Sequence, residues 1–156
     1  MSDHHLAQIN VGTMKYPLDD PRMHGFTSML DEVNALADAA PGFVWRLIGD
    51  GDADATGLRP TGDEKVLVNF SVWENRQTLW DFVYRSAHLD VMRGRRDWFE
   101  SPAGQYQVLW WVPAGTIPTV QEALDRLDAL RREGSTPRAF TFRDTFTPAD
   151  LEAARG

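Results

Sequence analysis

The residues of this chain that are best suited to chemistry lie in the segment Val66 to Trp73 and in the helix predicted after it. Within this apolar segment, strand alternation places the side chains of Asn69 and Trp73 on one face. Polar groups that converge in an apolar setting are typical of ligand pockets, so Asn69 is a candidate site residue. The structural alternative is that Asn69 caps a sheet bulge or bonds to Gln8 or Asn10 across the sheet, because a buried amide without a partner costs about 1–3 kcal/mol.

Tyr84 and His88 are four residues apart and share one face of the predicted helix. Histidine is the side chain whose ordinary pKa suits proton transfer near neutral pH, which makes His88 a candidate catalytic group. A packing or capping role is the alternative, since no nucleophile motif surrounds His88. The four histidines lack metal-ligand spacing and the chain has no cysteine, so we expect neither a metal site nor a cofactor.

Two further side chains could contribute to a ligand site. Arg46 lies inside an apolar run, where an unpaired guanidinium would be very costly. It is interpreted either as one half of a salt bridge at the sheet edge or across a dimer interface, or as an anchor for a carboxylate or phenolate. Trp110 and Trp111 point to opposite faces of a strand, so at most one lines a given cavity, and Trp111 is taken as the ligand-binding member.

The elements that must position these residues follow from apolar periodicity. Four apolar or alternating runs predict strands at residues 6–14, 43–49, 66–73 and 106–113. Helices are expected from Asp20-Pro21, from Asn75 through to about residue 99, and from the capping box at Thr119 to Gly134. Residues 139–146 could form a short strand before a C-terminal tail. The Gly- and Asp-rich segment 50–64 is interpreted as a solvated hairpin loop, because Thr61 stands where a calcium loop needs Glu.

The resulting order β-α-β-β-α-β predicts a ferredoxin-like α+β fold with an antiparallel sheet and an extra C-terminal helix. We expect a single domain over residues 1–156, with a core of about 6–113 and a C-terminal helix and tail at 114–156. Two helices cover one face of such a sheet, whereas the third and fourth strands are apolar on both sides. A second copy pairing sheet to sheet would bury the other face, which predicts a homodimer; a terminal segment covering that face is the alternative.

Composition limits the class of protein. Six tryptophans and 42% hydrophobic residues exclude a disordered chain, and a formal net charge of -7 argues against nucleic-acid or anionic-membrane partners. No apolar run approaches the roughly 20 residues of a membrane span. The N-terminal residues lack the basic start and apolar stretch of a signal peptide, so a cytoplasmic location is expected.

Five segments resemble an uncharacterised bacterial family within the dimeric α+β barrel superfamily, which includes the antibiotic-biosynthesis monooxygenases. These segments are PGFVWRL at 41–47, NFSVWE at 69–74, FVYRSAH at 82–88, LWWVPAG at 109–115 and TPRAFTF at 136–142. The resemblance covers about residues 6 to 142. It implies the barrel fold and the homodimer and leaves the activity open.

The resemblance also implies roles for particular residues. In quinone-forming, cofactor-free monooxygenases an Asn and a Trp four positions apart hold a phenolic substrate, and Asn69 and Trp73 are similar in spacing and place. Asn69 would bond the substrate oxygen as it becomes anionic, and Trp73 would stack on the ring. Haem-degrading members use an Asn on the first strand, which Asn10 resembles, but His88 lies about a turn too early for their helical His, so no haem is expected.

These observations lead to one main interpretation and two alternatives. The main one is a small-molecule-binding dimeric barrel protein, a monooxygenase-like enzyme without a cofactor acting on a hydrophobic aromatic or quinone-type compound. The first alternative is a non-catalytic ligand-binding or stress-accessory protein with the same pocket. The second is a purely structural dimer with a filled core.

Overall fold

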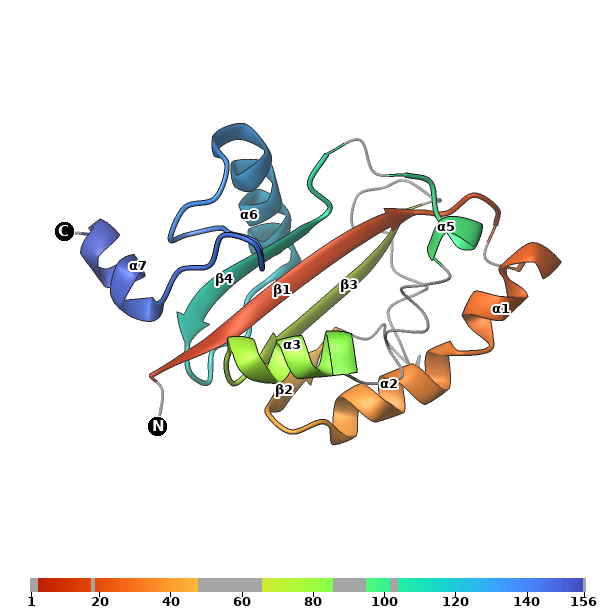
Figure 1. Ribbon diagram of the computed structural model, residues 1–156, viewed down its shortest axis with the longest axis horizontal. Helices are drawn as coiled ribbons and strands as arrows, with labels where there is room; N and C mark the ends of the chain where they lie inside the picture. The colour runs from red at the N-terminus through yellow and green to blue at the C-terminus, as the bar shows by residue number, and fades with distance from the viewer. Residues whose placement is uncertain (1–2, 18, 48–65, 86–94, 102–103, 156) are drawn as a thin grey trace.

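The computed structural model, which describes residues 3–17, 19–47, 66–85, 95–101 and 104–155, contains a four-stranded antiparallel sheet (Figure 1). The strands are β1 (His4–Thr13), β2 (Phe43–Arg46), β3 (Val66–Trp73) and β4 (Gln107–Pro113), in the spatial order β2-β3-β1-β4. This order confirms the predicted ferredoxin-like α+β fold. β1 is central, and its residues Leu6 to Asn10 are paired with both β3 and β4.

The first helical region begins as predicted but is broken in the middle. Asp20 caps its start by accepting the Arg22 backbone N–H at 2.9 Å, and Pro21 occupies the first helical position. Hydrogen bonds from Arg22 lower the pKa of Asp20 to about 2. The three pieces are η1 (Pro21–Met23), α1 (His24–Thr27) and α2 (Leu30–Ala39). Near the break, the hydroxyl groups of Thr27 and Ser28 donate back to helical carbonyl oxygens, a competition that bends helices.

The helix after β3 starts at the predicted cap. Asn75 Oδ1 accepts the Thr78 backbone N–H at 2.9 Å, and α3 runs from Arg76 to Arg85. Residues 86–94 lie outside the described part of the chain, and a short helix α5 (Arg95–Trp98) follows them. α3 is covered from two directions: Leu79 and Val83 face the sheet, whereas Trp80 packs on Phe142 from the C-terminal segment.

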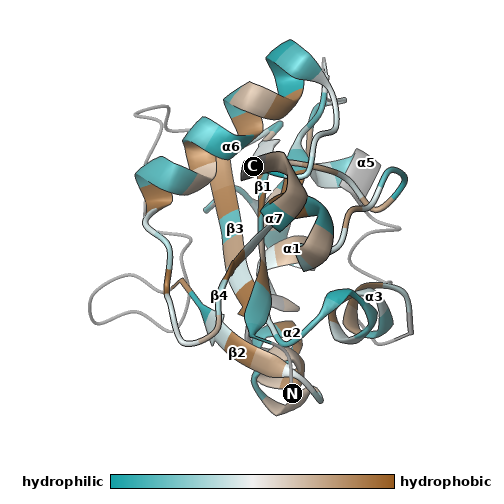
Figure 2. Cartoon of the chain, turned by 90° about the vertical axis from the view of Figure 1, so that its left-hand side faces the viewer, coloured by the Kyte–Doolittle hydropathy of each residue, from teal (hydrophilic) through white to brown (hydrophobic). Residues whose placement is uncertain are grey.

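α6 (Val120–Glu133) packs on the sheet face that the predicted homodimer was expected to bury. Thr119 Oγ1 accepts the Glu122 N–H at the start of this helix, and Gly134 ends it with a φ of 76°. Its buried side chains, Ala123, Leu127 and Leu130, pack on the sheet face opposite α3. Figure 2 shows the strands between α6 on one side and α3 with α1 on the other.

The sheet face reserved for a second copy therefore carries the chain's own helix, as in the alternative left open by the sequence. The homodimer itself stays a prediction. Within the described part of the chain, no helix combines the length and the apolar character that a membrane span requires.

The C-terminal segment differs from the prediction in two ways. The expected strand at residues 139–146 is reduced to isolated bridges. Phe140 exchanges backbone hydrogen bonds of 2.8 and 2.9 Å with Leu109 of β4, and Ala139 pairs with Thr136. The expected tail contains a helix, α7 (Pro148–Arg155). Thr147 and Asp150 close its first turn reciprocally, with each side chain accepting the other's backbone N–H.

Candidate functional site

A band of polar side chains crosses the sheet face on which α3 lies. This polar band consists of Gln8, Asn10, Asn69, Ser71 and Gln107, all on alternating positions of β1, β3 and β4. Register explains the grouping: Asn10 lies directly between Asn69 and Gln107, and Gln8 lies opposite Ser71. Side chains distant in the sequence thus meet on one face because β1 is paired on both edges.

Gln8 is the centre of the polar band and is 2% exposed. Its Nε2 donates to Asn69 Oδ1 and to Ser71 Oγ, both at 2.8 Å. Its Oε1 accepts from Asn10 Nδ2 and from Gln107 Nε2, both at 3.2 Å. The buried amide is therefore fully paired, and it orients the two asparagines beside it.

The asparagines present complementary groups above the sheet. Since Asn69 Oδ1 is bound by Gln8, its Nδ2 is left as a donor, and Asn69 is exposed. Since Asn10 uses its Nδ2 on Gln8, its Oδ1 is left as an acceptor. Neither atom has a protein partner among the residues that the structure describes. One hydroxyl group could accept from Asn69 and donate to Asn10 at the same time.

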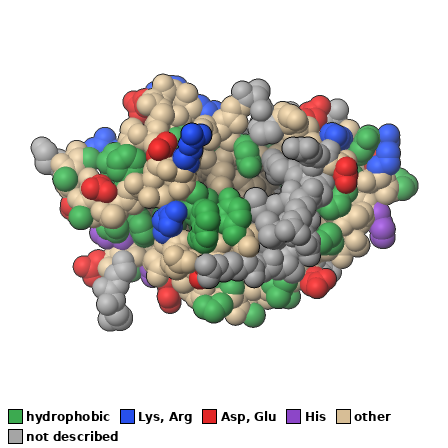
Figure 3. Space-filling model, in the orientation of Figure 1, with side chains coloured by type: hydrophobic (Ala, Val, Ile, Leu, Met, Phe, Trp, Pro, Cys, Tyr) green, Lys and Arg blue, Asp and Glu red, His purple; other side chains and the backbone are tan. Residues whose placement is uncertain are grey.

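Two hydrophobic clusters flank the polar band along the strands. The Trp73 cluster lies beyond Gln8 and Ser71, and the Phe26 cluster lies beyond Asn10 and Asn69. Their buried members are Leu6, Trp73, Leu79, Val83, Leu109 and Phe140 in the first, and Met14, Met23, Phe26, Leu67 and Phe99 in the second. Figure 3 views this face, and hydrophobic side chains gather near its centre. A ligand on the polar band would meet polar atoms below and apolar walls at its ends.

Trp73 belongs to the core of this face and is 1% exposed. Its ring stacks on Phe82 at 5.1 Å between centroids and meets Phe43 edge-on at 5.5 Å. Its Nε1 donates to Ser71 Oγ at 2.9 Å. Trp73 therefore contacts the polar band through Ser71, while protein side chains occupy its ring.

Arg46 shares this face but is engaged by an acid. It lies opposite Ser71 in the register, and its Nε donates to Asp38 Oδ1 on α2 at 2.7 Å. A second contact, from Nη2 to Asp38 Oδ2, measures 3.3 Å. This pair is the salt bridge at the sheet edge that was one of the two interpretations of Arg46.

Tyr84 and Trp111, two further predicted site residues, contact other groups than the polar band. Tyr84 packs against Trp80 at 4.2 Å and Phe142 at 6.2 Å between centroids, on the side of α3 that meets the C-terminal segment. Trp111 donates its Nε1 hydrogen to the Phe146 carbonyl oxygen at 2.8 Å. His88 lies outside the described residues. Of the predicted site residues, Asn10 and Asn69 lie together in the polar band, and Tyr84 lies apart from it.

Gln8 and Gln107 were not among the predicted site residues. The alternation Leu6, Gln8, Asn10 signals that two amides share one face, and Gln107 opens a strand whose next same-face residues are apolar. Pairing each strand with β1 would have brought the glutamines to the asparagines, but the register is a tertiary property.

Comparisons with known proteins agree on the fold. A family model described as Domain of unknown function (DUF3291) matches residues 5–155, and no curated protein sequence matches the chain. SnoaB, a cofactor-independent oxygenase from Streptomyces nogalater, is similar in structure with a TM-score of 0.50 and 19% identity, over 76% of this chain and 100% of SnoaB. A candidate antibiotic biosynthesis monooxygenase from Nitrosomonas europaea gives a TM-score of 0.50 and 14% identity, over 76% and 96% of the two chains. At these identities the likeness shows a shared fold.

Proposed function

Because the chain belongs to the family described as a domain of unknown function (DUF3291), and shares its fold with a cofactor-independent oxygenase, we propose that it binds a hydrophobic aromatic compound carrying a hydroxyl group. The observation that carries this proposal is the free donor of Asn69 beside the free acceptor of Asn10. These two atoms match the lone pair and the hydrogen of one phenolic hydroxyl. The flanking clusters match an aromatic body.

The proposed chemistry is monooxygenase-like and needs no external reductant. A hydroxyarene takes one oxygen atom of O2 at the carbon opposite its hydroxyl, and the other oxygen leaves as water with two hydrogens of the substrate. 1-Naphthol and O2 would thus give 1,4-naphthoquinone and water. The hydroxyl binds as the neutral phenol. Once its proton is lost, the phenolate is the electron-rich form that reacts, and a hydrogen bond from Asn69 stabilises its negative charge. Trp73 acts as a positioning residue, because it fixes Ser71 and through it Gln8.

A binding role without turnover is the second candidate, and one observation favours it. The described members of the polar band are amides and a hydroxyl group, none of which is a base strong enough to remove a phenolic proton near neutral pH. A protein that only sequesters its ligand needs no such base. His88, the predicted proton-transfer group, is the residue on which the two candidates differ.

Two measurements on the same protein test the proposal. Fluorescence titration with 1-naphthol measures binding, and 1-methoxynaphthalene, which cannot donate a hydrogen bond, serves as the matched ligand. We expect 1-naphthol to bind at least tenfold more tightly, the equivalent of one good hydrogen bond. An oxygen electrode then separates the candidates, since the enzyme consumes one O2 per quinone formed. Equal affinity for both ligands would refute the site.

The homodimer remains a proposal that rests on the resemblance. Because α6 packs on β1 and β4 on the sheet face opposite α3, a second copy could not bury that part of the face. Sedimentation equilibrium at micromolar concentration distinguishes a monomer from a homodimer. A monomeric mass would contradict the proposed homodimer.

A further inference from the structure

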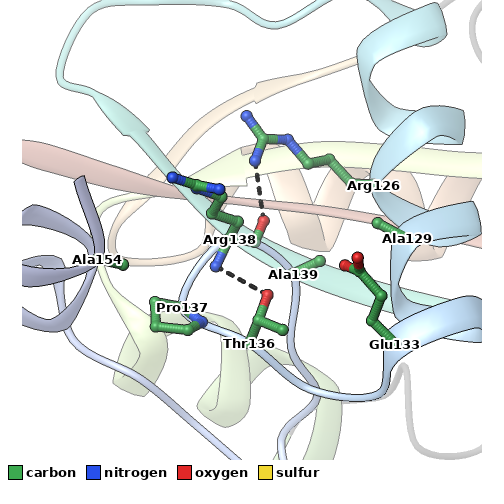
Figure 4. A pocket seen from close by; sticks show the side chains of 8 residues that line it. All are labelled: Arg126, Ala129, Glu133, Thr136, Pro137, Arg138, Ala139 and Ala154. Carbon is green, nitrogen blue, oxygen red and sulfur yellow. Dashed lines mark hydrogen bonds between the residues drawn. The ribbon is translucent and has the colours of Figure 1, made fainter.

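A cavity lies away from the polar band, between α6, the turn that follows it and α7. It has a volume of about 250 Å³ (Figure 4). The residues that line it are Arg126, Ala129, Glu133, Thr136, Pro137, Arg138, Ala139 and Ala154. None of them belongs to the proposed site on the sheet.

Small side chains create this cavity. Arg126, Ala129 and Glu133 follow one another at helical spacing along one side of α6. Ala129 on α6, Ala139 in the turn and Ala154 on α7 each present a single methyl group, so three elements approach without filling the space between them. The walls are consequently mostly apolar.

Two arginines give the cavity a positive charge. Arg126 Nη1 donates to the Arg138 carbonyl oxygen at 3.0 Å, and the Arg138 N–H donates to Thr136 Oγ1 at 3.2 Å, as the dashed lines in Figure 4 show. These bonds fix the guanidinium group of Arg126 and the backbone of Arg138 beside the cavity. Within the described part of the chain, no carboxylate lies within 4.0 Å of either guanidinium, although Glu133 lines the same cavity.

We propose that this cavity binds a small organic carboxylate with a short apolar body. Guanidinium groups recognise carboxylates through paired N–H donors, and the alanines and Pro137 suit an aliphatic chain. The volume lies below the roughly 300–1,000 Å³ of ordinary drug-sized pockets, which limits the ligand to a few carbon atoms. Glu133 disfavours a ligand with several negative charges. The carboxylate would join α7 to α6 through the turn.

Titration of the full-length protein with sodium butanoate tests the proposal. Butanamide has the same shape without the charge, and inorganic phosphate has the charge without the apolar body. Amide NMR signals of Ala129, Ala139 and Ala154 report occupancy of the cavity directly. We expect saturable shifts at these three residues with butanoate, and no saturation with butanamide or phosphate.

Substitutions test whether Arg126 and Arg138 bind the carboxylate. Arg138→Gln and Arg126→Gln should each weaken butanoate binding by about tenfold or more, because one charge-assisted contact is lost. Arg143→Gln changes an exposed arginine that does not line the cavity and should bind as the unmodified protein does. Ala129→Met keeps both charges and fills the space, so it should abolish binding. Equal binding of phosphate, unchanged binding by Arg138→Gln, or unchanged binding by Ala129→Met would each overturn the proposal.

Discussion

Replacing Asn69 with Asp tests the polar band with the smallest possible change in shape. The Asp carboxylate can still accept the 2.8 Å hydrogen bond from Gln8, so the buried amide keeps its partner. The change converts the free Nδ2 donor into an acceptor that carries a negative charge. A ligand that binds as a phenolate therefore loses a hydrogen bond and meets a like charge.

The expected loss can be worked out from these two terms. A hydrogen bond to a charged group contributes about 1.5–3 kcal/mol. Two like charges about 4 Å apart repel by about 1 kcal/mol in water and about 4 kcal/mol near a protein surface, and the exposure of Asn69 favours the lower value. The sum of about 2.5–4 kcal/mol corresponds to roughly a hundredfold to a thousandfold weaker binding of the phenolate.

The assay is a fluorescence titration of 1-naphthol at a pH above the pKa of its hydroxyl group, where the ligand is the phenolate, together with a thermal melt of each variant. Asn69→Asp should lower affinity while leaving the melting temperature nearly unchanged. Asn69→Ala removes the donor without adding charge, so its affinity should lie between that of Asn69→Asp and that of the unmodified protein. Gln121→Ala, on the exposed side of α6, is the control and should change neither quantity. The reasoning is refuted if Asn69→Asp binds 1-naphthol as tightly as the unmodified protein, or if its affinity falls only in proportion to unfolding.

Three further outcomes follow from the described contacts. Gln8→Leu should lower the free energy of unfolding by about 1–3 kcal/mol in urea denaturation, because its partners on β1, β3 and β4 lose their buried hydrogen bonds; an unchanged unfolding midpoint would contradict the central role of Gln8. Leu127→Ala should cost about 2–5 kcal/mol by the same measurement, since this side chain of α6 is 2% exposed against the sheet. The pKa of Asp20, lowered from 3.8 to about 2, means that its contribution to stability is present above pH 3.8 and is lost as the pH falls through about 2. NMR of the Asp20 carboxyl carbon should follow this titration, and Arg22→Ala should return the pKa of Asp20 toward 3.8. If Arg22→Ala leaves the pKa of Asp20 unchanged, Arg22 is not the cause of the shift.

Local patterns predicted the elements that position the site. Alternation in β1 placed Gln8 and Asn10 on one face, and the apolar run of β3 gave its bounds, Val66–Trp73, directly. Capping side chains located the starts of three helices, at Asp20, Asn75 and Thr119. These features depend on neighbouring residues alone, which is why the sequence was sufficient for them.

What the sequence left open depends on contacts between distant segments. Arg46 had two interpretations until Asp38 on α2 was found beside it, and the ring of Trp73 was expected on a ligand before Phe43 and Phe82 were seen to cover it. The face that α6 covers was likewise decided by tertiary packing. α7 was missed for a different reason, because Thr147, Pro148 and Asp150 form a recognisable helix start that was read as a tail.

The packing of α6 has a consequence for how this sheet could change over evolution or in the laboratory. Ile9, Val108 and Trp110 face α6, and they alternate with the polar-band residues along the same strands. A slip of one residue in strand pairing would turn these buried side chains outward, so their packing holds the register independently of the opposite face. Asn10, Asn69 and Gln107 can therefore be exchanged for other polar or apolar residues without loss of strand alignment. Ligand preference on this scaffold should be re-engineerable by substitutions on one face alone.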